Sequence, residues 1–154
     1  MFTRRQAIGT IGSAAVSFAA PAAFAHTYPT VTLHKDPSCG CCTDWGKHIE
    51  AAGFPVTVIN SPNVKALKRQ VGVPQDLAGC HTAEVSGYIL EGHVPAAALQ
   101  RLIDERPDAI GLAVAGMPAG SPGMGGEPEA YDVVLFTHTS RSVYGRFKGA
   151  ERIG

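Results

Sequence analysis

Three of the four cysteines in the chain lie within four consecutive positions, in the segment Cys39-Gly40-Cys41-Cys42. The fourth, Cys80, is followed directly by His81. Clustered thiolates bind soft metals such as Cu(I), Zn(II) or iron-sulfur centres in preference to hard cations. The same residues could instead form a redox couple or structural disulfides, so the spacing has to decide among three kinds of chemistry.

The spacing of the thiols favours copper among the soft metals. Structural zinc sites commonly use two separated ligand pairs around a tetrahedron, whereas here three thiols crowd one turn. Thiolates that bridge several Cu(I) ions are compatible with such crowding, and none of the familiar iron-sulfur spacings is present. We therefore expect Cu(I) to be bound by Cys39, Cys41, Cys42 and Cys80, with zinc as the less favoured alternative.

Three further side chains are candidate ligands. His81 adjoins Cys80 and could bind a metal or donate a hydrogen bond to a thiolate. Met117 and Met124 lie in a segment rich in glycine and proline, and their thioethers suit Cu(I), although methionines there could equally fill gaps where the segment packs over the sheet. His93 precedes a predicted helix, and we expect it to bond to the backbone rather than to a metal.

The alternative function is an oxidoreductase in which Cys39 and Cys42, a C-x-x-C pair, cycle between dithiol and disulfide. A two-electron couple needs only two sulfurs, so the additional Cys41 favours metal binding. Two structural disulfides are disfavoured because the adjacent Cys41 and Cys42 cannot easily both find well-formed partners. We assign no catalytic residue and leave open whether the protein is an enzyme. In copper-free protein exposed to air, we expect Cys39 and Cys42 to pair.

The hydrophobic pattern alternates between strand and helix. β-rich runs and helical periodicity with capping residues predict the order strand, helix, strand, helix, strand, helix. The predicted strands cover residues 30–36, 55–60 and 82–90, and the predicted helices cover residues 42–54, 61–72 and 94–105. Residues 107–130 form a long Gly/Pro-rich loop, and residues 131–149 form a hairpin that extends the sheet.

This order predicts a single α/β domain that resembles the thioredoxin-like architecture, with the Gly/Pro-rich loop and the C-terminal β-hairpin as extensions. The C-x-x-C pair falls at a helix N-terminus, where the helix dipole favours thiolate over thiol. Cys80, His81 and Thr82 would form the turn that faces this pair. Thioredoxin-like proteins carry a proline in that turn, and its absence here argues against disulfide exchange on protein substrates.

The first 25 residues have the features of an export signal. They include Arg4 and Arg5, an apolar stretch and the small residues that end at Ala25, and they resemble a twin-arginine signal. The apolar stretch is shorter than the roughly 20 residues of a membrane span, so we expect no membrane anchor after cleavage. Residues 26–154 would then form the exported, metal-binding domain.

The charge of the chain excludes one class of partner. There are 13 basic and 13 acidic residues, and the export segment removes two arginines and no acidic residue. The remaining domain therefore carries a slight negative charge, which gives no electrostatic basis for binding nucleic acid.

Three ordered motifs connect the chain to a known family. They are CGCC at residues 39–42, GCHTAEVSGYILEGHVP at residues 79–95 and GLAVAGMPAGSPGM at residues 111–124. With these motifs the chain resembles the CopG-like periplasmic copper-resistance proteins, a metal-binding family, from about residue 31 to residue 147. The resemblance implies a thioredoxin-like fold, a periplasmic location and a role in copper resistance, with metal ions and other periplasmic copper-handling proteins as partners.

Overall fold

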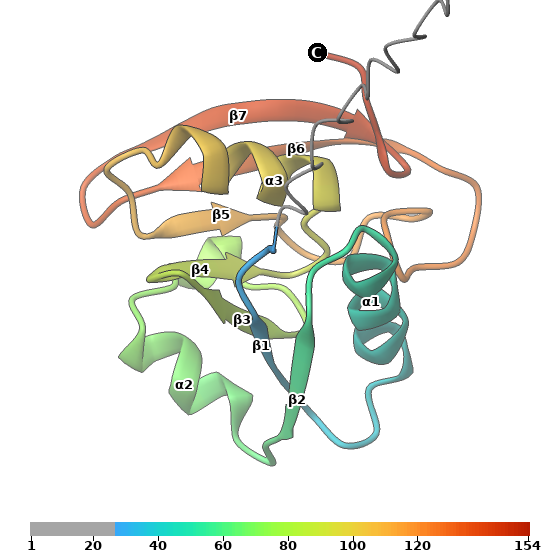
Figure 1. Ribbon diagram of the computed structural model, residues 1–154, viewed down its shortest axis with the longest axis vertical. Helices are drawn as coiled ribbons and strands as arrows, with labels where there is room; N and C mark the ends of the chain where they lie inside the picture. Colours follow the sequence, from blue (N-terminus) through green and yellow to red (C-terminus); the bar gives the residue numbers. More distant parts are fainter. Residues whose placement is uncertain (1–26) are drawn as a thin grey trace, which may run out of the picture.

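The computed structural model describes residues 27–154 and shows one eight-stranded mixed sheet with three α-helices (Figure 1). The predicted export signal lies outside the described residues. None of the helices within residues 27–154 is long and apolar enough to cross a membrane. The strand order across the sheet is β2-β1-β3-β4-β5-β6-β7-β8.

The elements follow the predicted order of strands and helices, with additional short strands. The strands are β1 (Val31–Lys35), β2 (Val56–Asn60), β3 (Thr82–Val85), β4 (Tyr88–Glu91), β5 (Gly111–Ala113), β6 (Ala130–Phe136), β7 (Arg141–Lys148) and β8 (Glu151–Arg152). The helices are α1 (Gly40–Ala51), α2 (Val64–Gln70) and α3 (Ala96–Glu105), with a 3-10 helix η1 (Gln75–Leu77) after α2.

Three local predictions were wrong. Residues 107–130 are not a loop throughout, because β5 lies within them and pairs with β4 and β6. Residues 82–90 form two strands rather than one, because Ser86 and Gly87 both adopt positive φ angles, 49° and 85°, and turn the chain into a hairpin. Helix α2 begins at Val64 rather than after Ser61. Its N-cap is Asn63, whose side chain accepts a hydrogen bond from the Ala66 N–H at 3.1 Å.

Strand pairing determines which segments meet at the site. β1 pairs with β2 in parallel and with β3 in antiparallel orientation. The C-terminal end of β1 and the N-terminal end of β3 therefore lie side by side at the same end of the strands. Helix α1 follows β1, and Cys80 precedes β3. The predicted C-terminal hairpin is confirmed as β6 and β7, which extend the sheet beyond β5.

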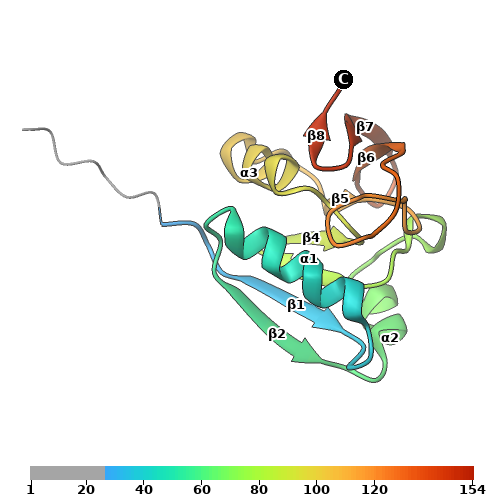
Figure 2. The same ribbon diagram turned by 90° about the vertical axis from the view of Figure 1, so that its right-hand side faces the viewer.

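The core lies on both faces of the sheet. The larger cluster joins Trp45 of α1 and Leu99 of α3 to the side chains of the central strands, among them Leu90. Ile89, the neighbour of Leu90 on β4, points to the opposite face, where it belongs to a smaller cluster with Phe136. Figure 2 shows α1 running along one side of β1 and β2.

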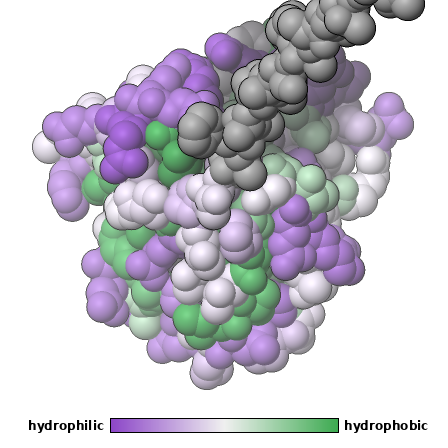
Figure 3. All heavy atoms as spheres, in the orientation of Figure 1, coloured by the Kyte–Doolittle hydropathy of each residue, from purple (hydrophilic) through white to green (hydrophobic). Residues whose placement is uncertain are grey.

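The edge strand β2 carries exposed apolar side chains. Val58 and Ile59 are both more than 40% exposed. Figure 3 shows apolar residues interspersed with hydrophilic ones over the face that contains this edge.

His48 links helix α1 to the beginning of α3 and gives a testable pH dependence. Its Nε2 accepts a hydrogen bond from the Ala96 N–H at 3.0 Å, and burial lowers its pKa below the usual 6.5. Between the two pKa values, His48 is protonated in the unfolded chain and neutral in the folded chain. The stabilisation from the buried, neutral His48 is therefore present above about pH 6.5 and is lost as the pH falls.

We expect the free energy of unfolding to fall between about pH 7.5 and about pH 5.5, and to fall less in the His48→Gln variant. The glutamine oxygen can accept the same hydrogen bond but does not titrate. Urea unfolding of both proteins at the two pH values measures the difference. An equal loss in both would show that His48 does not contribute.

Candidate metal centre

The first turn of α1 carries three of the four thiols. Cys39 is the N-cap residue, and Cys41 and Cys42 follow within the first turn. Cys39 and Cys42 form a disulfide with their Cα atoms 5.4 Å apart, as expected for the copper-free oxidised chain. Cys41 and Cys80 are free thiols, so the chain has one disulfide rather than two.

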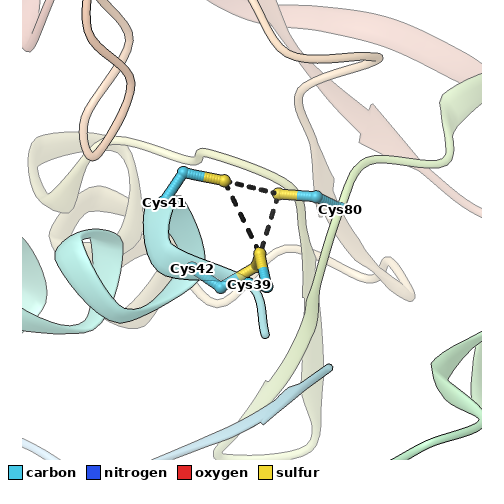
Figure 4. A group of neighbouring side chains, drawn as sticks. All are labelled: Cys39, Cys41, Cys42 and Cys80. Atoms are coloured by element: carbon cyan, nitrogen blue, oxygen red, sulfur yellow. Dashed lines mark hydrogen bonds between the residues drawn. A yellow bond between two sulfur atoms is a disulfide. The ribbon is translucent and has the colours of Figure 1, made fainter. Parts of the chain in front are cut away.

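Cys80 lies against this turn, although it is far away in the sequence (Figure 4). Its Sγ is 3.5 Å from Cys42 Sγ and 3.7 Å from Cys41 Sγ, and Cys41 Sγ is 3.5 Å from Cys39 Sγ. All four sulfurs lie within 4.8 Å of one another. The pairing of β3 with β1 explains this proximity, and the prediction that Cys80 would adjoin the C-x-x-C pair is confirmed.

Two glycines allow the segments that carry Cys80 and His93 to touch. A Cβ atom on Gly79 would lie 2.6 Å from the Cα of Gly92, and one on Gly92 would lie 2.5 Å from the carbonyl oxygen of Val114. Only residues without side chains permit such backbone contact. This backbone contact brings together Cys80 and His93, which directly follow Gly79 and Gly92.

His93 contacts Cys80 directly. Its Nδ1 is 2.6 Å from the carbonyl oxygen of Pro122, which can only accept, so Nδ1 carries the proton. The lone pair is then on Nε2, which lies 2.9 Å from Cys80 Sγ. The sequence interpretation had placed His93 outside the site. One feature of the sequence could have indicated His93. Like Cys80, it directly follows a glycine and has a side chain that can bind a metal.

His81, a candidate from the sequence, is completely buried beside the same thiol. Its Nδ1 lies 3.5 Å from Cys80 Sγ, and its ring lies 4.4 Å from the ring of Trp45. Within the described part of the chain, Nε2 has no hydrogen-bond partner. Cys80, His81 and His93 form a second group whose ligand atoms lie within 4.8 Å of one another. Cys80 therefore belongs to two groups, one of sulfurs and one that includes both imidazoles.

Burial keeps the metal-free groups neutral. It raises the pKa of the Cys80 thiol to about 12, with neighbouring Cys41 adding to the effect and Lys68 opposing it. Burial also lowers the pKa of His93, and it lowers that of His81 still further, with His93 and Lys68 adding to the effect at His81. A metal that binds here must displace the proton from Cys80, while the imidazoles already have free lone pairs.

A buried ion pair anchors the segment before Cys80. Lys68 of α2 donates to the Glu91 carboxylate, which also accepts from the Gly79 N–H at 2.7 Å and from the Thr82 hydroxyl at 2.7 Å. Glu91 is completely buried and Lys68 nearly so. The carboxylate therefore fixes the backbone on either side of Cys80.

The Gly/Pro-rich loop between β5 and β6 packs onto the cluster. A Cβ atom on Gly123, whose φ is +88°, would lie 2.6 Å from the Trp45 N and 2.7 Å from the Cys41 carbonyl oxygen. Pro122 is buried and holds His93. Met124 is half-buried next to Gly123. Met117 is 56% exposed, which does not favour a role for its thioether as a ligand in the cluster.

Replacing Gly123 by alanine is expected to lift this loop from α1, because the new methyl group would overlap backbone atoms that cannot move aside. We expect a loss of about 1–3 kcal/mol in the free energy of unfolding and faster alkylation of Cys41. Gly125→Ala is the matched control, since a Cβ there meets no atom within 4 Å. Denaturant unfolding and timed alkylation measure both effects, and equal behaviour of the two variants would contradict the packing argument.

A cavity of about 430 Å³ reaches Cys80 from the side of α2. It is lined by Asp36, Pro62, Asn63, Val64, Lys65, Lys68, Gly79 and Cys80. The cluster is thus covered by the loop on one side and open to a cavity on another.

Comparison with known proteins identifies relatives of this chain. A family model described as "Protein of unknown function, DUF411" matches residues 77–124, the part that contains Cys80, His81 and His93. No curated protein matches the chain.

Two solved structures, "Copper resistance protein copG- Form 1" and "Copper resistance protein copG- Form 2", are each 45% identical to the chain. Each match covers 78% of this chain and 98% of the solved one, with TM-scores of 0.72 and 0.74. With identity at this level over nearly the whole of those proteins, the chain belongs to the CopG-like copper-resistance family.

Proposed function

We propose that the protein binds copper as Cu(I) through Cys39, Cys41, Cys42 and Cys80 when these thiols are reduced, and that it thereby contributes to copper resistance or copper homeostasis. The observation that carries this proposal is the group of four sulfurs within 4.8 Å of one another. Four thiolates so close together would share metal ions rather than bind them independently, and bridging thiolates are typical of multinuclear Cu(I) sites.

A second function, a copper-coupled or thiol-disulfide oxidoreductase, is favoured by one specific observation. The Cys39–Cys42 disulfide lies next to two free thiols, with Cys80 Sγ 3.5 Å from Cys42 Sγ. Thiolate attack on a disulfide sulfur is the elementary step of thiol-disulfide exchange, and here attacking and accepting sulfurs already lie near contact. Copper binding and redox turnover would then use the same residues in different oxidation states.

The proposal extends to architecture and location. The order β1-α1-β2-α2-β3-β4-α3, with the C-x-x-C pair at the N-terminus of α1 and Cys80 opposite it, supports a thioredoxin-like assignment. The family membership and the features of residues 1–25 support export to the periplasm, with residues 26–154 as the working domain. Metal ions are the expected partners, with other copper-handling proteins of that compartment as donors or acceptors.

Anaerobic titration of the reduced protein with Cu(I), followed by mass spectrometry under non-denaturing conditions, tests the proposal. We expect more than one Cu(I) per chain, and loss of this binding when Cys39, Cys41, Cys42 and Cys80 are all replaced by serine. A parallel titration with Zn(II) compares the two metals. No bound copper in the reduced protein, or full binding in the serine variant, would refute the proposal.

A further inference from the structure

The disulfide-bonded chain retains a set of ligands that does not need Cys39 or Cys42. We propose that Cys80, His81 and His93 form a distinct one-copper site, with one sulfur and two nitrogen ligands, which remains available when Cys39 and Cys42 are oxidised. This site goes beyond the four-cysteine centre proposed above, with which it shares only Cys80, and it does not depend on that centre.

The distances suit a single ion. A metal bound at about 2.0 Å to nitrogen and about 2.3 Å to sulfur holds the two ligand atoms roughly 3.5–3.7 Å apart. His81 Nδ1 is already 3.5 Å from Cys80 Sγ. His93 Nε2, now hydrogen-bonded to the sulfur at 2.9 Å, would have to withdraw by roughly 0.7 Å, which is a small side-chain adjustment.

His93 is oriented as metal-binding histidines usually are. Such residues donate their second ring N–H to a carbonyl or carboxylate, which fixes the tautomer and aims the other nitrogen at the metal. Here Nδ1–H donates to the Pro122 carbonyl at 2.6 Å, and Nε2 faces Cys80. The loop that carries Pro122 therefore prepares His93 for coordination.

His81 is buried beside Trp45 with one ring nitrogen facing the proposed metal position. It is 0% exposed, its Nε2 is unpartnered within residues 27–154, and its Nδ1 has the Cys80 sulfur as neighbour. Nδ1 of this imidazole has the Cys80 sulfur at 3.5 Å as its partner, which is a long and weak contact for a buried polar atom. A metal shared with Cys80 would give Nδ1 a stronger partner, and the proton of the neutral ring would then lie on Nε2.

The charge at the site selects Cu(I) over Zn(II). As the ion binds, Cys80 loses its thiol proton to solvent, and both imidazoles remain neutral. Cu(I) with one thiolate then carries no net charge, whereas Zn(II) with the same ligands carries +1. Both histidines are completely buried, so the neutral complex avoids the desolvation penalty of a buried net charge.

The test uses the oxidised protein, with the disulfide verified by intact mass, titrated anaerobically with Cu(I) against a competing Cu(I) chelator. We expect one Cu(I) per chain. His81→Gln and His93→Gln should each weaken binding at least about tenfold, and Cys80→Ser should abolish it. Cys41→Ser should retain binding, which separates this site from a Cys41–Cys80 sulfur pair. His138→Gln, in the exposed β6–β7 turn, is the matched histidine control.

X-ray absorption of the copper-loaded oxidised wild type reports the ligands even if a histidine variant fails to fold. One sulfur and two nitrogens would support the site, and a spectrum with sulfur ligands alone would overturn it. Absence of copper from the oxidised chain would also overturn it, while leaving the reduced four-cysteine centre intact. Conversely, binding of only one Cu(I) by the reduced protein would refute the multinuclear four-cysteine centre but would be consistent with the site at Cys80, His81 and His93.

Discussion

Alanine in place of Glu91 is expected to lower the free energy of unfolding by about 3–5 kcal/mol, because it leaves the buried Lys68 ammonium without its partner. Glu91 is completely buried and accepts from three donors, so its removal also leaves the Gly79 N–H without an acceptor. Since Gly79 adjoins Cys80, we expect folded Glu91→Ala protein to bind copper more weakly than the wild type. Denaturant unfolding and Cu(I) competition measure the two effects.

Two further variants separate charge from packing. Replacing both partners, as Lys68→Met with Glu91→Leu, removes the unpaired charge and should recover much of the stability that Glu91→Ala loses. Lys47→Met, at an exposed ion pair with Asp44, is the surface comparison and should change the stability little. A Glu91→Ala variant as stable as Lys47→Met would show that the buried pair does not anchor the segment.

The second large effect concerns the reactivity of the thiols. We expect alkylation to label the two free cysteines, Cys41 and Cys80, in the disulfide form, and all four cysteines after reduction. With Cu(I) bound to the reduced protein, labelling should be strongly slowed at every cysteine, because a coordinated thiolate is no longer free to attack. Counting labels by intact mass at timed intervals distinguishes the three states.

Removing the copper with a chelator should restore the labelling of the reduced protein, which controls for irreversible oxidation. The same measurement with Met117→Leu and Met124→Leu tests the loop. Unchanged protection in these variants would rule out a required thioether, and equal labelling with and without copper would contradict thiolate coordination itself.

The cysteine cluster could be predicted because short-range and topological signals agreed. Three thiols were adjacent in sequence, and a strand predicted to adjoin β1 placed Cys80 beside them. The strand break at Ser86-Gly87 was missed because continuous β-rich residues obscured a two-residue turn that depends on positive φ angles.

His93 was missed for a different reason. Its position depends on backbone contact between Gly79 and Gly92 and on a carbonyl supplied by Pro122, which lies 29 residues further along the chain. Periodicity and capping rules describe neighbours in sequence, and they contain no information about such a contact. Likewise, nothing in the sequence indicated that Lys68 and Glu91 would meet beneath Cys80.

The cavity lined by Asp36, Lys65 and Cys80 gives solvent access to the candidate metal centre from the side of Cys80. The Pro122–Gly123 segment covers another side of the cluster, against α1, and the Pro122 carbonyl oxygen accepts a hydrogen bond from His93 there. An ion exchanged with a partner would therefore meet the sulfur of Cys80 first and the imidazoles last. Under the proposed copper-binding function, ions would therefore enter and leave from the side of Cys80, and their release would depend on dissociation from the imidazoles farther in.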